Sequence, residues 1–128
     1  MSASQIVLLI LGSLLLINWA RKFWLLKSLT HYSAAEVKDK LKRENILLLD
    51  VRTDMERRSQ AIKGSLHIPS GQLRSRISEL EKYKNKEIIC YCRSGNRSLK
   101  SASLLKTHGF RSANMKGGIV KWNFSNKK

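Results

Sequence analysis

The sequence predicts an α/β domain with a central parallel sheet flanked by helices, preceded by one N-terminal apolar helix. Two segments, Asn45–Val51 and Lys86–Cys92, each contain a continuous apolar run, which is the pattern of strands buried on both faces, and such strands belong to parallel sheets. Segments with helical periodicity alternate with these runs. The third observation is a stretch without charge, Ile6–Ala20, which predicts the separate N-terminal helix.

The uncharged stretch "IVLLILGSLLLINWA" is long enough to cross a bilayer once its flanking residues extend it. We expect a transmembrane helix over residues 5–24, within an anchor and juxtamembrane segment of residues 1–29. Arg21 and Lys22 follow the apolar run, which favours an uncleaved anchor over a cleaved signal peptide. The positive-inside rule then predicts a single-pass protein of the cytoplasmic (inner) membrane, with its N-terminus outside and its domain in the cytoplasm. A helix lying flat in the interface is the other alternative.

Residues 30–128 form the predicted domain, which begins with a helix. Ser33 is a suitable N-cap for a helix over residues 34–44, and Glu36 completes a capping box. The later elements are a short helix over 55–62, a strand over 64–69, a helix over 70–83 capped by Ser70, a helix over 98–109 that ends at Gly109, a last strand with a glycine turn over 111–118, and a short helix or tail over 119–124.

The chain is strongly basic, with 25 Lys and Arg against 9 Asp and Glu and a net charge of +16. Such an excess favours anionic partners, although a solvated basic surface has the same composition. Few aromatic residues accompany the basic ones, so we expect no nucleic-acid partner. Membrane lipid and small anions remain as the expected partners.

Both cysteines lie in the stretch "CYCRSGNRS", residues 90–98. Cys92 ends a predicted strand, and Gly95 permits a tight loop whose backbone N–H groups turn inward before the next helix. The helix start and the two arginines, Arg93 and Arg97, favour the thiolate form of Cys92. A thiolate beside an anion-binding loop is a nucleophile suited to anionic substrates.

Plainer structural roles compete with this interpretation. Cys92 could pack as a small residue at the end of a strand, with the arginines solvated. For Cys90, which lies inside the strand, packing in the core is the prediction and a resolving thiol is the alternative. A C-x-C pair with scattered histidines lacks the spacing of a zinc site, so we expect no metal and no cofactor.

Three segments together resemble the recurring motifs of the rhodanese family of sulfurtransferases: "LLLDVRTDMERRSQAIKGSLHIPSGQL", "CRSGNRS" and "MKGGIVKW". The resemblance extends from about Ser33 to Trp122 and implies a single rhodanese-like domain. It implies that Cys92 takes a sulfane sulfur from a donor such as thiosulfate as a persulfide, and that a thiol, cyanide or a protein acceptor removes it. The loop residues implied to hold the persulfide and the donor anion are Arg93, Ser94, Gly95, Asn96, Arg97 and Ser98.

Loop length separates two reactions in this resemblance. Four residues between the cysteine and the arginine accompany sulfur transfer, whereas phosphatases of the same fold have one more. Here Arg93–Asn96 are the four, so sulfur transfer is favoured over a phosphatase or an arsenate reductase. A binding module that uses the loop for recognition without turnover is the alternative from another class.

Asp50 and Arg52, in the segment "LDVR", are expected to support neighbouring loops through hydrogen bonds and an ion pair. The segment "QAIKGS" departs from the family pattern at Gln60, Ala61 and Lys63. We expect this departure to alter a turn and to leave activity intact.

Overall fold

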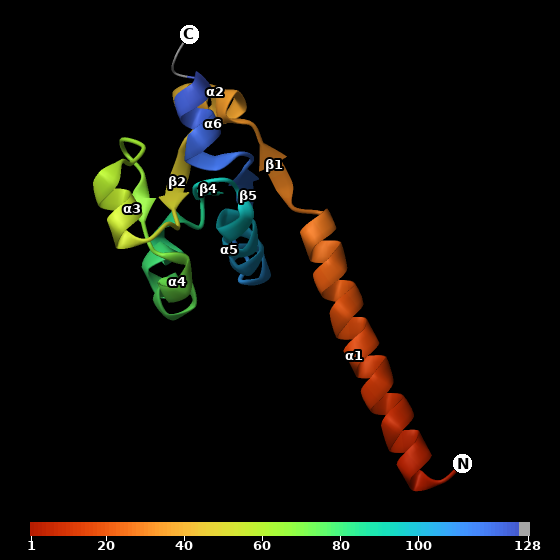
Figure 1. The fold of residues 1–128 in the computed structure, drawn as a ribbon. Coiled ribbons are helices and arrows are strands. Elements are labelled where there is room, and N and C mark those ends of the chain that lie inside the picture. The colour runs from red at the N-terminus through yellow and green to blue at the C-terminus, as the bar shows by residue number, and fades with distance from the viewer. Residues whose placement is uncertain (126–128) are drawn as a thin grey trace.

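The structure, a computed structural model, describes residues 1–125, and its strands and helices alternate along the chain (Figure 1). The strands are β1 (Thr30–Tyr32), β2 (Ile46–Asp50), β3 (Leu66–His67), β4 (Glu87–Tyr91) and β5 (Ser112–Met115). The helices are α1 (Ala3–Lys27), α2 (Ala34–Arg43), α3 (Asp54–Ser59), α4 (Ser70–Arg76), the 3-10 helix η1 (Ile77–Tyr83), α5 (Asn96–Thr107) and α6 (Gly118–Ser125).

The five strands form one parallel sheet in the order β1-β5-β4-β2-β3. Helices α4, η1 and α5 cover one face, whereas α2 and α6 cover the other. This arrangement confirms the predicted α/β class with a central parallel sheet.

Both faces of the central strands are buried, as their continuous apolar sequence predicts. Ile88 and Cys90 of β4 point into a core that contains Leu73 and Leu105. Ile89 and Tyr91, the alternate residues of the same strand, point into a second core on the opposite face. Two separate cores therefore sandwich one sheet, and β4 lies at its centre.

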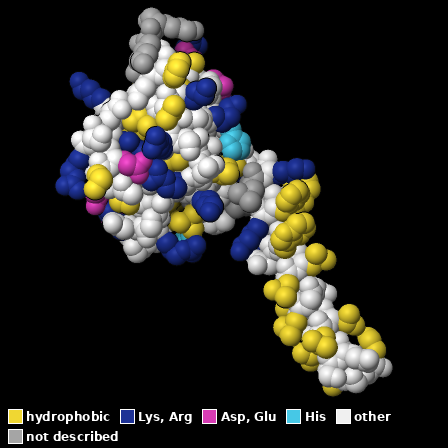
Figure 2. Space-filling model, in the orientation of Figure 1, with side chains coloured by type: hydrophobic (Ala, Val, Ile, Leu, Met, Phe, Trp, Pro, Cys, Tyr) yellow, Lys and Arg dark blue, Asp and Glu magenta, His cyan; other side chains and the backbone are white. Residues whose placement is uncertain are grey.

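The apolar helix α1 projects away from the domain, and its hydrophobic side chains are exposed along its length (Figure 2). Residues Ala3–Trp24 are long and apolar enough to cross a membrane, a test that a signal sequence also passes. The chain then enters the sheet almost at once, because only Ser28 and Leu29 separate α1 from β1.

Several elements differ from the sequence-based prediction. Strand β1 was not predicted, because a strand of three residues is too short to show the alternation of apolar and polar residues that identifies strands. The helix predicted over 70–83 is two elements, and Ser70 is not its cap: Pro69 holds that position without a side-chain hydrogen bond. Helix α5 begins at Asn96, two residues before the predicted start.

Candidate active site

Cys92 lies at the carboxyl end of β4, at the edge of the sheet where open α/β proteins place their binding sites. Its side chain is buried, with 1% exposure. The chain turns into α5 after three residues, and Gly95 occupies the N-cap position with a φ of 114°, which favours glycine. The thiol therefore lies at the bottom of a tight loop.

Hydrogen-bond donors converge on the sulfur of Cys92. The backbone N–H of Gly95 donates to Sγ at 3.0 Å, and the hydroxyl of Ser98 lies 3.4 Å from it. Burial by itself raises the pKa of a thiol, but hydrogen bonds from the neighbouring groups, led by the Ser98 hydroxyl and N–H, together lower the pKa of Cys92 below its ordinary value. The N–H groups of Gly95 and Ser94 act in the same direction.

The six predicted loop residues occupy different environments. Arg93, Ser94 and Asn96 are exposed, whereas Gly95 and Ser98 are buried. The side chains of the exposed residues point to solvent. The inner surface of the loop, which faces Cys92, is therefore formed mainly by backbone N–H groups and the start of α5. Arg97 is half-buried and faces a neighbouring helix.

Arg97 forms a two-point ion pair with Glu56, at 2.6 Å and 2.9 Å between nitrogen and oxygen atoms. Hydrogen bonds from Arg97 lower the pKa of Glu56 to about 2. Glu56 is held at the start of α3 by a capping box with Thr53. The pair thus ties the cysteine loop to α3 and orients the guanidinium of Arg97.

A hollow of about 530 Å³ between α4 and α5 adjoins Arg97. Arg74 and Lys100 also line it. Among residues 1–125, neither of these two side chains has a hydrogen-bond or ion-pair partner. Three cations therefore surround one opening beside the loop, which favours the approach of an anion.

A second set of polar residues supports Ser98 from the opposite side. The Ser98 hydroxyl lies 2.6 Å from Oδ1 of Asn114, which is buried in β5, and Nδ2 of Asn114 lies 3.2 Å from Nδ1 of His31 in β1. A hydroxyl has one proton, so Cys92, Gly95 O and Asn114 compete for it. Asn114 therefore fixes the position of Ser98 relative to the thiol.

Ser98→Ala is expected to raise the pKa of Cys92, because the variant removes a hydrogen bond that favours the thiolate. At neutral pH, alkylation of Cys92 by iodoacetamide should slow by about tenfold, since a hydrogen bond to a charged group contributes roughly 1.5 kcal/mol or more. The pH profile of alkylation, followed by mass spectrometry, should move to higher pH. Ser94→Ala is the control, because it keeps the backbone N–H that faces the sulfur; an equal shift in both variants would contradict this account.

Cys90 lies in a different environment, although it is only two residues away. It is fully buried in the core on the α5 side of the sheet, and burial raises the pKa of its thiol far above the ordinary value. Both cysteines are free. Cys90 thus remains a protonated core residue at neutral pH.

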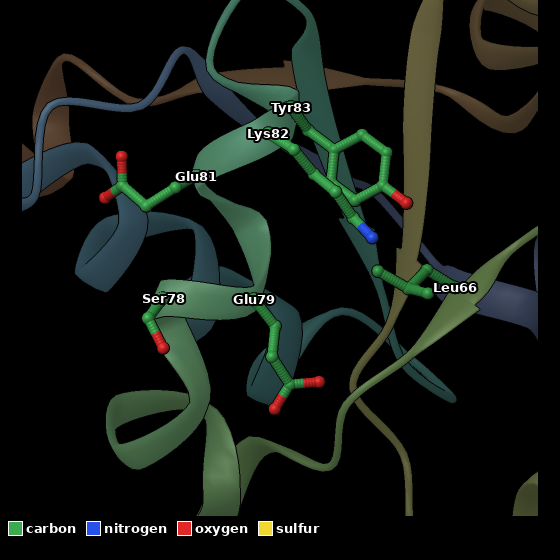
Figure 3. Close-up of a pocket in the computed structure, with 6 residues that line it drawn as sticks. All are labelled: Leu66, Ser78, Glu79, Glu81, Lys82 and Tyr83. Carbon is green, nitrogen blue, oxygen red and sulfur yellow. The ribbon is translucent and has the colours of Figure 1, made fainter.

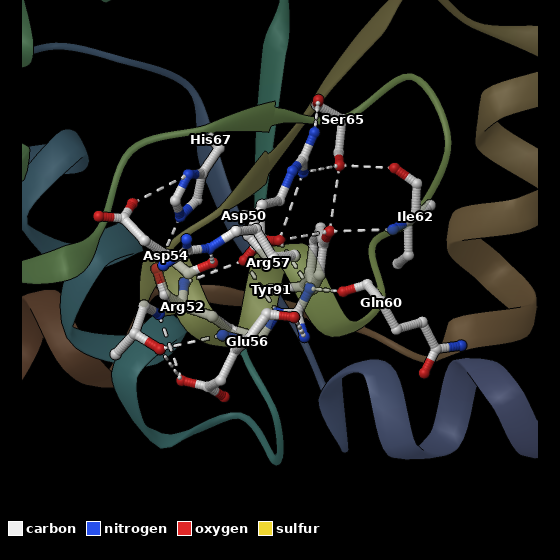
Figure 4. Close-up of polar contacts among 12 residues, drawn as sticks. Asp50, Arg52, Asp54, Glu56, Arg57, Gln60, Ile62, Ser65, His67 and Tyr91 are labelled. Atoms are coloured by element: carbon white, nitrogen blue, oxygen red, sulfur yellow. Dashed lines mark hydrogen bonds and ion pairs between the residues drawn. The ribbon is translucent and has the colours of Figure 1, made fainter.

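Asp50 and Arg52 pair behind the loop in a buried network (Figure 4). The Arg52 guanidinium donates to Asp50 at 2.8 Å and 3.0 Å, and the Tyr91 hydroxyl donates to the same carboxylate at 2.9 Å. Tyr91 also accepts a hydrogen bond from Ile62, in the segment where the chain departs from the family pattern. The network joins the ends of β2 and β4 to that turn.

Three residues near the loop were not among the predicted site residues. Glu56 had a detectable signal, the T-x-x-E spacing of its capping box, but its partner is 41 positions away. Asn114 is a polar residue in a buried strand, which is itself unusual. Gly118 lies in the quoted segment "MKGGIVKW", and its N-terminal turn of α6 contacts the loop: Ile119 N–H donates to Cys92 O at 2.9 Å.

Comparisons with known proteins identify the family of this chain. The family model described as "Rhodanese-like domain" matches residues 33–125. The chain is 35% identical over 91 residues to the Bacillus subtilis protein YtwF, covering 70% of this chain and 86% of that protein. It is 36% identical over 80 residues to a sulfurtransferase of Allochromatium vinosum, covering 62% and 73% of the two chains.

Among solved structures, a rhodanese-like domain protein from Staphylococcus aureus superposes with a TM-score of 0.69 at 27% identity. The match covers 73% of this chain and 91% of that one. The family model, the curated relatives and the fold all agree with the resemblance of the three motifs. The chain belongs to the rhodanese-like domain family.

Proposed function

We propose that this chain is a sulfurtransferase in which Cys92 accepts a sulfane sulfur from a donor such as thiosulfate and passes it to a thiol, to cyanide or to a protein acceptor. One observation carries the proposal: a buried thiol at a strand end has its pKa lowered by hydrogen-bond donors that converge on its sulfur. Sulfurtransferases among the relatives support sulfur transfer in general.

In the first step, the Cys92 thiolate attacks the outer sulfur of thiosulfate. A new S–S bond forms to Cys92, the S–S bond of thiosulfate breaks, and sulfite leaves with its electron pair. The backbone N–H groups of Ser94 and Gly95 would then face the terminal sulfur and stabilise its negative charge. The cations of the hollow, Arg74 and Lys100, favour the approach of the dianionic donor.

In the second step, an acceptor thiolate or cyanide attacks the terminal sulfur of the persulfide. The S–S bond to Cys92 breaks, and its electron pair returns to Cys92 as a thiolate. The same donors that lower the pKa of Cys92 make it a good leaving group. No electron acceptor, metal or cofactor enters this balance.

The test is an intact mass of the detergent-solubilised full chain after incubation with thiosulfate. We expect a gain of one sulfur atom that is lost on adding cyanide, absent in Cys92→Ser and retained in Cys90→Ser. A protein with no gain, or with a gain that persists in Cys92→Ser, would contradict the proposal. A reactive Cys92 without turnover on any donor would instead favour a binding module.

We also propose that α1 anchors the domain to the membrane, with its N-terminus outside and the domain in the cytoplasm. The exposed apolar helix over Ala3–Trp24 and the basic residues that follow it, Arg21, Lys22 and Lys27, support this orientation. Reporter fusions at the two termini give the sidedness directly. A C-terminal reporter found outside the cytoplasm would reverse the assignment.

A further inference from the structure

The junction between α1 and the sheet fixes which edge of the domain lies nearest the membrane. Only Ser28 and Leu29 connect α1 to β1. Leu29 is buried in the core, and Lys106 at the end of α5 donates to both the carbonyl and the hydroxyl of Ser28 at 3.0 Å. The junction is therefore held to the domain.

All five strands are parallel, so their amino ends share one edge of the sheet. The chain enters that edge from α1 through β1. In Figure 1, α4 and α5 lie below the sheet, in the direction in which α1 runs, whereas α2 and α6 lie above it. The Cys92 loop follows the carboxyl end of β4, at the opposite edge.

Basic side chains gather at the amino edge, around the loops that precede β4 and β5. They are Lys82, Lys84, Lys86, Lys106 and Arg111, and we name them the amino-edge basic cluster. Its neighbouring acid Glu81 pairs with Lys84 at 3.4 Å. Figure 2 shows Lys and Arg side chains around the junction of the apolar helix and the domain.

Aromatic rings hold three of these lysines at the surface. The ammonium groups of Lys82 and Lys86 lie 5.4 Å and 5.6 Å from the centre of the Tyr83 ring, and that of Lys84 lies 5.1 Å from the centre of Phe110. Figure 3 shows Lys82 extending alongside the Tyr83 ring at the rim of a cavity. These cation–π contacts position the ammonium groups at the surface of the domain, where anionic headgroups can approach them.

We propose that the amino-edge basic cluster binds anionic lipid headgroups, so that the domain rests on the bilayer with the Cys92 loop facing away from it. This inference depends on the anchor proposed above. Lipid is the occupant that fits, because the anchor delivers this edge to the headgroup layer and the cluster carries the opposite charge. The orientation leaves the Cys92 loop open to donors and acceptors in the aqueous phase.

The test is an acetylation footprint of the full chain in nanodiscs of neutral phosphatidylcholine, compared with discs that also contain phosphatidylglycerol. On the anionic discs we expect acetylation of Lys82, Lys84 and Lys86 to slow by about threefold to fivefold, and high salt should abolish the difference. The internal reference is a set of exposed lysines away from the amino edge, Lys63, Lys116 and Lys121, whose rates should not change.

A triple variant, Lys82→Glu, Lys84→Glu and Lys86→Glu, should abolish the lipid-dependent protection that remains measurable at Lys106. The matched variant Lys63→Glu, Lys116→Glu and Lys121→Glu should keep it. Equal acetylation in the two discs would overturn the docking while leaving the anchor and the sulfur chemistry untouched. Failure of the chain to join the discs would overturn the anchor and the docking together.

Discussion

Gly118→Ala is expected to reduce sulfur transfer by about a hundredfold, although Gly118 contributes no side chain to the reaction. A Cβ at this position would lie 2.3 Å from the carbonyl oxygen of Cys92 and 2.4 Å from that of Arg93. Both oxygens belong to the backbone of the cysteine loop and accept hydrogen bonds from Ile119 and Val120 in the first turn of α6. The methyl group must therefore displace either the loop or α6.

The backbone at Gly118 adds a second cost, because its φ of 56° disfavours residues with a side chain. Gly64→Ala separates the two costs: Gly64 has a φ of 84°, but nothing lies within 4 Å of the added Cβ. Gly64→Ala should lose about 1 kcal/mol of stability and keep its activity. Gly118→Ala should lose about 1–3 kcal/mol more.

The measurements are the rate of persulfide formation by intact mass and the unfolding midpoint in urea. Cys92 alkylation gives a third, independent measure of the loop. If Gly118→Ala kept the wild-type persulfide rate, the close contact of α6 with the loop would have no role in shaping it. If both variants lost activity equally, backbone strain rather than the collision would be responsible.

The strands that position Cys92 could be predicted from sequence because burial on both faces leaves a local pattern. Continuous apolar runs identify β2 and β4 without knowledge of their neighbours. The spacing of apolar residues could not distinguish α4 from η1, since α- and 3-10 helices both place them three or four positions apart. The type of helix therefore depends on tertiary packing, which cannot be read from the spacing of apolar residues in one sequence.

In the candidate site, too, local features could be predicted from the sequence, whereas contacts between distant segments could not. Local features of "CRSGNRS" predict the tight loop, the position of Gly95 and the preference for thiolate. The partners of the loop come from distant segments, such as Glu56 on α3 and Asn114 on β5. Their proximity is a consequence of the strand order, so no spacing in the sequence could reveal it.

Asp50 is a buried carboxylate whose contribution is to stability and not to the sulfur-transfer reaction itself. It is fully buried and accepts hydrogen bonds from Arg52, Tyr91 and Arg57 (Figure 4). Burial alone would raise the pKa of Asp50, but hydrogen bonds from Arg52, followed by that from Tyr91, lower it below the ordinary value. The carboxylate is therefore ionised at neutral pH and balances a guanidinium that is almost as buried.

Asp50→Asn is expected to lower the free energy of unfolding by about 3–5 kcal/mol, because it keeps the shape of the side chain but leaves the Arg52 cation buried without its counter-charge. Tyr91→Phe is the milder comparison. It removes one donor to Asp50 and the acceptor of the Ile62 N–H, so it should cost about 1–2 kcal/mol. Urea unfolding followed by circular dichroism measures both.

The pH dependence separates a charge effect from a packing effect. Since the pKa of Asp50 is lower in the folded than in the unfolded state, its ionised form contributes stability that is present above the ordinary carboxyl pKa. That stability is lost as the pH falls through the ordinary value toward the lower folded-state pKa. Asp50→Asn lacks this contribution at every pH, so the gap between wild type and variant should narrow on acidification. If the difference in unfolding free energy between wild type and variant stayed constant with pH, the destabilisation would arise from packing, and the ion pair between Asp50 and Arg52 would not be what stabilises the fold.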